Sequence, residues 1–213
     1  MSLQPLFNSH GCDKSKKHQY HLFYDQLFEK YPGPIKVLEI GVFKGDSTAA
    51  FIEYRPESEF YGADIFERVS IDEVYNRVNH KAKFAKCDSM SSKEVISAMR
   101  ALNCGYNTFD IIIDDGAHWP EANRLTLNNF FPYLKSGGTY VVEDVWPFHK
   151  MSLKELEHPW LKKHPDRYDQ LQYALFTNTV ETLQDQQGVE VHHFDLRAKT
   201  REPDSYIMSL KKL

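Results

Sequence analysis

Residues 37–47 have the sequence VLEIGVFKGDS, and this stretch decides the fold. Residues 35–40 are mostly apolar and predict a short buried strand, while residues 46–48 are of types that commonly begin a helix. Gly41 and Gly45 lie between them, where the absence of a Cβ lets the backbone approach a ligand closely. The turn also suits a plain strand-to-helix connection, because it is neither a dinucleotide fingerprint nor a P-loop.

Outward from this stretch, apolar runs alternate with amphipathic segments. The expected strands are residues 35–40, 59–65, 82–87, 109–113 and 139–142, and the expected helices are residues 46–52, 71–78, 92–103 and 121–134. This alternation predicts a parallel sheet with helices on both faces. Residues 190–196 and 205–211 alternate apolar and polar side chains and predict a final antiparallel pair. We therefore expect an α/β fold, namely a doubly wound, Rossmann-like, mostly parallel seven-stranded sheet with an antiparallel edge strand.

The composition narrows the class of partner. A chain of 213 residues with a net charge of -4 offers no overall basic surface, so we expect no nucleic acid partner. The three cysteines form no CxxC pair, which favours reduced thiols in a cytoplasmic protein. The first residues lack a charged and then apolar signal pattern, and no apolar run reaches about 18 residues. We therefore expect no membrane partner.

Acidic side chains follow all five strands of the predicted parallel sheet. In such a sheet, ligands bind outside the carboxyl ends of the strands. Carboxylates at the end of an apolar strand cost desolvation energy unless that edge is an open site. The sequence therefore predicts a polar binding edge formed by Glu39, Asp64, Asp88, Asp114, Asp115, Glu143 and Asp144.

The last two strand ends carry a second group of chemically active residues. Asp115, Glu143 and Asp144 could converge there, and carboxylate oxygens suit Mg²⁺ or a similar cation. His118 lies three residues beyond Asp115 and could act as a general base toward a substrate hydroxyl. A more ordinary alternative is that Asp114 and Asp115 fix a turn. In that case Glu143 and Asp144 cap the loop that follows them.

The first motif resembles that of class I S-adenosylmethionine-dependent methyltransferases. In that family, strand one leads into the motif E/D-x-G-x-x-x-G. Glu39, Gly41 and Gly45 match its three defined positions here. The resemblance implies that Asp64 binds the ribose hydroxyls of the cofactor, although it could instead cap a helix. It also implies an adenine-side contact from the pair Asp88 and Ser89.

The second group is similar to the macrocin O-methyltransferase type of sugar methyltransferase. That type has a D-D-G-S-H loop and a later E-D pair that bind a divalent metal, and its loop histidine is the proposed base. Here Ala117 replaces the serine. The similarity extends to a leader with Asp13, Lys14, His18, Tyr20 and Tyr24, and it covers residues 11–145. It implies metal ligation by Asp115, Glu143 and Asp144, with His118 and Asp115 as catalytic residues.

We expect a single domain over residues 1–213 with three parts. Residues 1–34 form a helical leader, in which residues 16–30 carry an apolar helical stripe and Lys14 helps to cover the cofactor. Residues 35–145 form the cofactor-binding core, where we also place Asp114 on the cofactor side. Residues 146–213 form a substrate excursion, a helix within residues 166–182 and the final strands.

The expected function is divalent-metal-assisted O-methylation, with S-adenosylmethionine and Mg²⁺ as cofactors and a hydroxyl of a sugar or glycosylated small molecule as acceptor. A metal-dependent enzyme acting on a catechol or another small phenol fits the same motifs. A nucleotide-dependent oxidoreductase would need a dinucleotide fingerprint, which the chain lacks. A non-catalytic cofactor-binding protein is the third alternative. Relatives of this type are often oligomeric, so a homo-oligomer is also an open expectation.

Overall fold

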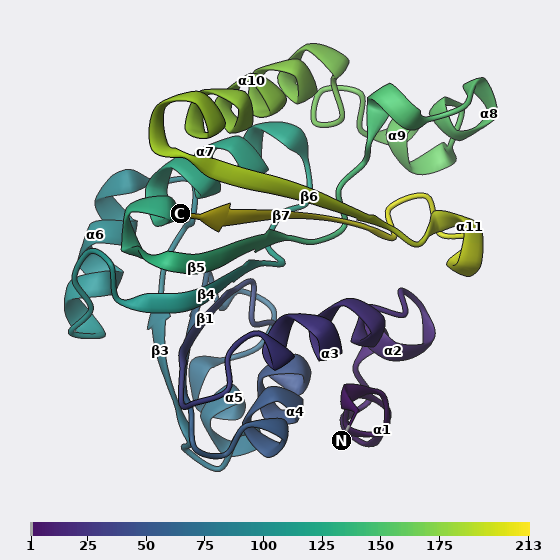
Figure 1. Cartoon of the computed structure of the whole chain (residues 1–213). Coiled ribbons are helices and arrows are strands. Elements are labelled where there is room, and N and C mark those ends of the chain that lie inside the picture. The colour runs from purple at the N-terminus through teal and green to yellow at the C-terminus, as the bar shows by residue number, and fades with distance from the viewer. Residues whose placement is uncertain (1) are drawn as a thin grey trace.

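A seven-stranded sheet forms the centre of the computed structural model, which describes residues 2–213 (Figure 1). The sheet order is β3-β2-β1-β4-β5-β7-β6. The seven strands are β1 (Lys36–Ile40), β2 (Glu59–Asp64), β3 (Ala82–Lys86), β4 (Phe109–Asp114), β5 (Leu134–Val142), β6 (Val189–Asp195) and β7 (Tyr206–Lys212).

Strands β1 to β5 are parallel, and β7 pairs antiparallel with both β5 and β6. The expected mostly parallel sheet with an antiparallel pair at one edge is therefore confirmed. The chain leaves β1 toward β2 on one side and returns to β4 on the other side. Such a reversal opens a crevice at the carboxyl ends of the strands. The crevice lies where the sequence places its acidic residues.

Helices cover both faces of the sheet (Figure 1). Each strand alternates its side chains between two apolar clusters, so that Leu38 and Ile40 face one layer and Val37 faces the other. The first layer contains α6 (Ser92–Ala101), α7 (Pro120–Phe130) and α10 (Gln170–Gln187). The second layer contains α1 (Leu3–His10), α3 (His21–Glu29), α4 (Asp46–Tyr54) and α5 (Ile71–Arg77). Short elements complete the chain: α2 (Asp13–Lys16), α8 (Leu153–Leu156), α9 (Pro159–Lys163), α11 (Arg197–Thr200), and the 3-10 helices η1 (Phe131–Tyr133) and η2 (Phe148–Lys150).

The leader differs from the single helix expected over residues 16–30. The structure breaks it into α2 and α3, with Gln19 in a left-handed conformation at φ 55° between them. The break turns His18 and Tyr20 inward, and both are buried. The apolar stripe in the sequence marked the buried face of α3 correctly, but the polar residues before it gave no sign of the break.

Residues 135–138 form an irregularity of the sheet near the start of β5. Phe109 pairs with Leu134, whereas Ile111 pairs with Thr139. Four residues of β5 therefore lie opposite one residue of β4, and the Lys135 ammonium lies 2.8 Å from the Asp110 carboxylate. Because the strand resumes after this bulge, the pairing runs on to the acidic end of β5.

The later part of the chain follows the expected outline. The polar excursion contains α8 and α9, and α10 begins where the Asp169 side chain accepts hydrogen bonds from the N–H groups of Leu171 and Gln172. Within residues 2–213, no helix combines the length and the hydrophobicity that a membrane span requires.

Candidate active site

The glycine turn after β1 packs directly on the loop after β4. Gly41 has a φ of +85°, and a Cβ there would lie 2.1 Å from the carbonyl oxygen of Asp115. The Asp115 N–H in turn donates to the carbonyl of Ile40 at 2.9 Å. The two motifs, 74 residues apart in the sequence, are therefore in direct backbone contact at the carboxyl ends of β1 and β4.

Asp64 lies half-buried at the end of β2 and organises the neighbouring loops. Its carboxylate accepts hydrogen bonds from the N–H groups of Phe43 and Phe66, both at 2.8 Å. Beside it, the apolar side chains of Phe43 and Ile65 are 48% and 43% exposed. A carboxylate between two exposed apolar side chains offers acceptors for hydroxyl groups and a surface for a flat ring.

The next predicted pair, Asp88 and Ser89, follows β3 and is half-buried. Asp88 Oδ1 accepts from the Met90 N–H at 2.9 Å, and Ser89 Oγ lies 2.9 Å from Thr126 Oγ1. Both residues therefore border the same edge as Asp64, at the end of the neighbouring strand.

Glu39 does not reach the open edge. It is buried at 2% exposure, and its two oxygens accept from the Ser47 and Thr48 hydroxyls at 2.5 Å each. Burial raises the pKa of this carboxyl above its ordinary value. Glu39 thus links β1 to the first turn of α4 from behind the glycine turn.

Asp114 is also buried, below the loop that follows β4. Its Oδ1 accepts from the Gly116 N–H at 3.3 Å, and burial raises the pKa of its carboxyl to about 7. The structure therefore places Asp114 under the loop that carries Asp115, and the exposed edge is left to Asp115.

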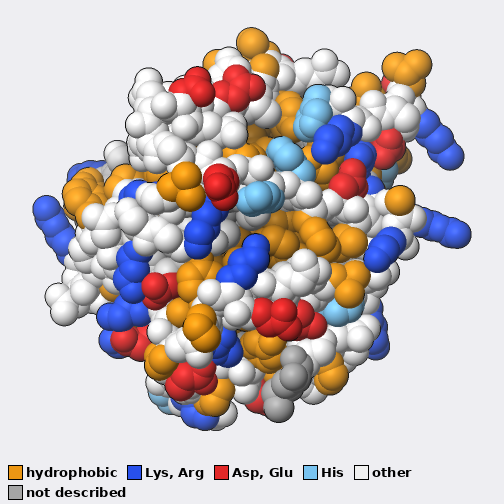
Figure 2. All heavy atoms as spheres, viewed as in Figure 1, with side chains coloured by type: hydrophobic (Ala, Val, Ile, Leu, Met, Phe, Trp, Pro, Cys, Tyr) orange, Lys and Arg blue, Asp and Glu red, His pale blue; other side chains and the backbone are white. Residues whose placement is uncertain are grey.

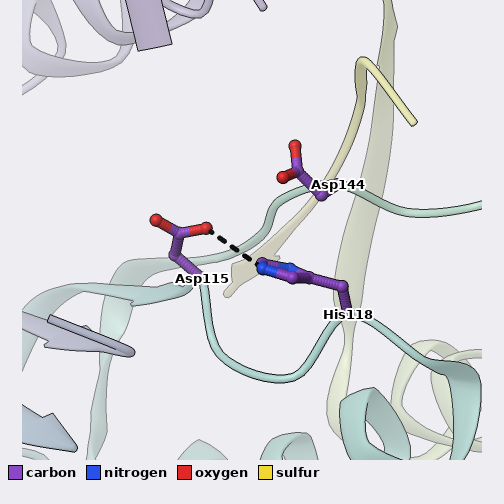
Figure 3. A group of neighbouring side chains, drawn as sticks. All are labelled: Asp115, His118 and Asp144. Atoms are coloured by element: carbon purple, nitrogen blue, oxygen red, sulfur yellow. Dashed lines mark ion pairs between the residues drawn. The ribbon is translucent and has the colours of Figure 1, made fainter. Parts of the chain in front are cut away.

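Asp115, His118 and Asp144 converge on one space at the carboxyl ends of β4 and β5 (Figure 3). One ligand atom from each of the three lies within 4.8 Å of the others. His118 Nε2 is 3.8 Å from Asp115 Oδ1, and all three residues are half-buried. This is the kind of donor set that can hold a metal ion, and two of its members are predicted ligands.

Glu143, the third predicted ligand, lies behind this group. It is 1% exposed, and its Oε1 accepts from the Tyr24 hydroxyl. Its Oε2 lies 2.6 Å from the ammonium of Lys14, which also reaches Asp115 Oδ2 at 2.5 Å. Lys14, assigned above to the cofactor side, is thus part of the acidic centre.

The charges of this centre leave an excess that suits a divalent cation. Burial alone would lower the pKa of Lys14, but the Asp115 and Glu143 carboxylates outweigh it and raise that pKa well above the usual value. Burial would likewise raise the pKa of Asp144, yet His118 and other neighbours lower it. Burial raises the pKa of Glu143 well above its usual value, and the carboxyl oxygens of this centre outnumber its one ammonium, a donor set of the type that Mg²⁺ prefers.

A second layer of side chains supports Asp144, and neither of its members is among the site residues predicted from the sequence. The Tyr20 hydroxyl donates to Asp144 Oδ1 at 2.6 Å, and His18 Nδ1 lies 3.6 Å from the same oxygen. Both come from the segment between α2 and α3. The resemblance of residues 13–24 to the leader of macrocin-type enzymes was the one signal that pointed to them.

A separate hollow of about 310 Å³ lies between α3 and the strands β6 and β7. Figure 2 shows apolar side chains at its floor with lysine and histidine side chains near its rim. It is lined by Phe23, Leu27, Phe194 and polar neighbours, and by none of the predicted site residues.

The sheet order, the glycine turn after β1 and the acidic crevice define a Rossmann-like methyltransferase fold. The family model described as a methyltransferase domain matches residues 38–145, just over half of the chain. The chain belongs to this methyltransferase family.

Curated relatives share the same core. The chain is 30% identical over 137 residues to mycinamicin VI 2''-O-methyltransferase of Micromonospora griseorubida, covering 61% of this chain and 32% of that protein. It is 28% identical over 137 residues to demethylmacrocin O-methyltransferase of Streptomyces fradiae, with the same two shares. The matched region thus spans about a third of the length of these relatives.

Solved structures resemble the whole chain. The mycinamycin-pathway methyltransferase MycE, in complex with Mg, SAH and mycinamycin VI, superimposes with a TM-score of 0.70 at 21% identity. That match covers 100% of this chain and 54% of MycE. A caffeoyl-CoA O-methyltransferase-like protein from Staphylococcus aureus gives a TM-score of 0.55 at 14% identity, covering 90% and 81%. At identities this low, the superpositions establish a shared fold.

Proposed function

We propose that this protein is an S-adenosylmethionine-dependent O-methyltransferase that uses a divalent cation and methylates a hydroxyl of a sugar or glycosylated small molecule. The observation that carries this proposal is the convergence of Asp115, His118 and Asp144 at the methyltransferase crevice. The sugar O-methyltransferases among the relatives support the acceptor class.

The residues present fit both cofactors. Asp115 and Asp144 would hold the cation through carboxylate oxygens, and Lys14 would offset the charge of the buried Glu143. Asp64, with Phe43 and exposed apolar neighbours, would hold the ribose and the adenine of S-adenosylmethionine. When bound, S-adenosylmethionine supplies an electrophilic methyl group and the cation lowers the proton affinity of the acceptor hydroxyl.

His118 then has the position of a general base. Its imidazole points into the space between the two carboxylates, where the acceptor hydroxyl would lie. It would take the hydroxyl proton as the oxygen bonds to the methyl carbon and the bond from that carbon to sulfur breaks, with S-adenosylhomocysteine as the leaving group. A nitrogen that ligates the cation could not accept that proton, so base and ligand are alternative roles. We assign the base role because hard cations prefer the oxygen atoms of Asp115 and Asp144.

Calorimetry with S-adenosylhomocysteine, with and without Mg²⁺, tests the cofactors. We expect binding of S-adenosylhomocysteine and a separate Mg²⁺ site that Asp115→Asn weakens. If the nucleoside does not bind, the methyltransferase proposal is wrong. If it binds but Mg²⁺ does not, the cation is removed from the mechanism.

Turnover on a panel of glycosides and catechols tests the acceptor class and the base. We expect methylation of glycosides, and a fall of roughly 10² to 10⁴ in kcat for His118→Ala with Mg²⁺ affinity unchanged. Preference for catechols would favour the phenol alternative. Loss of Mg²⁺ binding in His118→Ala would show that the histidine is a ligand instead of the base.

A further inference from the structure

Asp144 adopts an unusual backbone conformation. Its φ is 53°, in the left-handed region that residues other than glycine rarely occupy. Such conformations persist where the surrounding structure holds them in place, and they concentrate at functional sites. The contacts of Asp144 therefore indicate what keeps this carboxylate pointed at His118 and Asp115.

The Tyr20 hydroxyl makes two contacts with this one residue. It donates its proton to Asp144 Oδ1 at 2.6 Å and accepts the Asp144 backbone N–H at 3.3 Å. The hydroxyl thus closes a ring between the main chain and the side chain of Asp144. Tyr20 itself is fully buried, and the Asp204 carbonyl oxygen lies 3.1 Å from the same hydroxyl.

His18 and Ser205 support Tyr20 from behind. The His18 ring stacks on the Tyr20 ring, with centroids 5.0 Å apart and an interplanar angle of 23°. His18 Nδ1 lies 2.9 Å from Ser205 Oγ, and both residues are buried. The leader and the start of β7 therefore meet at Tyr20, which restricts the movement of its hydroxyl.

We propose that Tyr20 is a positioning residue that holds Asp144 in the conformation that binds a divalent cation, with His18 and Ser205 bracing it. This inference rests on the proposed function, because it takes Asp144 as a ligand. A tyrosine that only fills the core would contribute to stability and would leave cation affinity unchanged. Partners that orient a ligand typically contribute 10- to 100-fold to metal affinity.

The test is Tyr20→Phe, which keeps the buried ring and removes the hydroxyl. Calorimetry on metal-free protein saturated with S-adenosylhomocysteine should show Mg²⁺ binding roughly 10- to 100-fold weaker than in the unaltered protein. S-adenosylhomocysteine affinity without Mg²⁺ should stay unchanged, and raised Mg²⁺ should restore turnover. The matched control is Tyr31→Phe, whose hydroxyl contacts Thr139 Oγ1 at 2.9 Å, away from the acidic centre.

Any other outcome contradicts either the positioning role of Tyr20 or the proposed function on which that role rests. Unchanged Mg²⁺ binding in Tyr20→Phe, or an equal loss of nucleoside and Mg²⁺ binding, overturns the positioning role. Absence of Mg²⁺ binding in the unaltered protein overturns the proposed cation itself. If Tyr20→Phe does not fold, Ser205→Ala carries the test, because it removes the hydroxyl that anchors His18. Mg²⁺ affinity equal to that of the unaltered protein in Ser205→Ala then contradicts the bracing.

Discussion

Replacing Gly41 with alanine should damage both stability and the acidic centre. The φ of +85° alone costs an alanine about 1 to 2 kcal/mol. The new Cβ would also lie 2.1 Å from the Asp115 carbonyl oxygen and 2.7 Å from the Gly116 Cα, so backbone must move. Forced displacement of this kind typically costs a further 1 to 3 kcal/mol. We therefore expect Gly41→Ala to lower the free energy of unfolding by about 2 to 5 kcal/mol.

The displaced atoms belong to the loop that carries Asp115 and His118. A misplacement of about 1 Å at reacting groups can reduce the rate roughly 10²-fold. Gly41→Ala should therefore lose turnover and Mg²⁺ affinity even under conditions where the protein remains folded. Urea unfolding measures the loss of stability, and calorimetry with Mg²⁺ at low temperature measures the loss of Mg²⁺ affinity.

Two other glycines separate the cost of the positive φ from the cost of the steric clash. Gly45 also has a positive φ, of +78°, but the three atoms nearest to a Cβ there all belong to side chains, the closest being a methyl of Val74 at 3.0 Å. Gly45→Ala should show the conformational cost with little of the clash. Gly33 has an ordinary φ and no atom within 4 Å, so Gly33→Ala should be nearly neutral. If Gly41→Ala costs no more than Gly45→Ala, the loop-to-loop contact is not tight and the reasoning fails.

Three further predictions concern titratable side chains. Lys14→Met should destabilise the protein by about 3 to 5 kcal/mol because it leaves Asp115 and Glu143 without their cation, and adding Glu143→Gln should restore part of the loss in urea unfolding. Glu39→Gln should cost about 1 to 3 kcal/mol in the same assay with S-adenosylhomocysteine affinity largely kept, and a large affinity loss would instead make Glu39 a direct ligand. Partial desolvation, aided by the nearby Lys150 and Arg197, lowers the pKa of His149 below 6.5, so stability should be retained above pH 6.5 and fall as the pH decreases toward the folded pKa. His149→Gln should flatten that slope, and an unchanged slope would assign the pH dependence to other groups.

The strands of the core could be predicted because their side chains face apolar layers on both sides. Residues 109–113 are all apolar except Asp110, and the strand β4 spans Phe109–Asp114. The acidic edge follows from the same reasoning, since parallel strands bring their carboxyl ends to one side. Sequence order and strand direction alone thus place Asp115 and Asp144 close together.

The ion pairs between the leader and the acidic centre could not be predicted, because they depend on how the leader packs on the sheet. Lys14 lies 129 residues from Glu143, and nothing local links them. The left-handed conformation of Gln19 decides where the leader turns, and neither it nor its neighbours are glycine. The bounds of the short helix α1 within the expected helical leader could not be predicted, because Leu3 and Phe7 are the two buried residues of an eight-residue segment, which is too weak a periodic signal.

The contacts around Asp144 have a consequence for how the protein is made. Tyr20 lies 124 residues from Asp144, and His18 lies 187 residues from Ser205. Loop closure over such separations follows the formation of local structure, so a chain growing on the ribosome can form β1 to β5 before its centre is complete. Until Ser205 has emerged, the brace on Tyr20 is missing. The contacts that hold Asp144 are therefore completed only after the residues at the start of β7 have been synthesised.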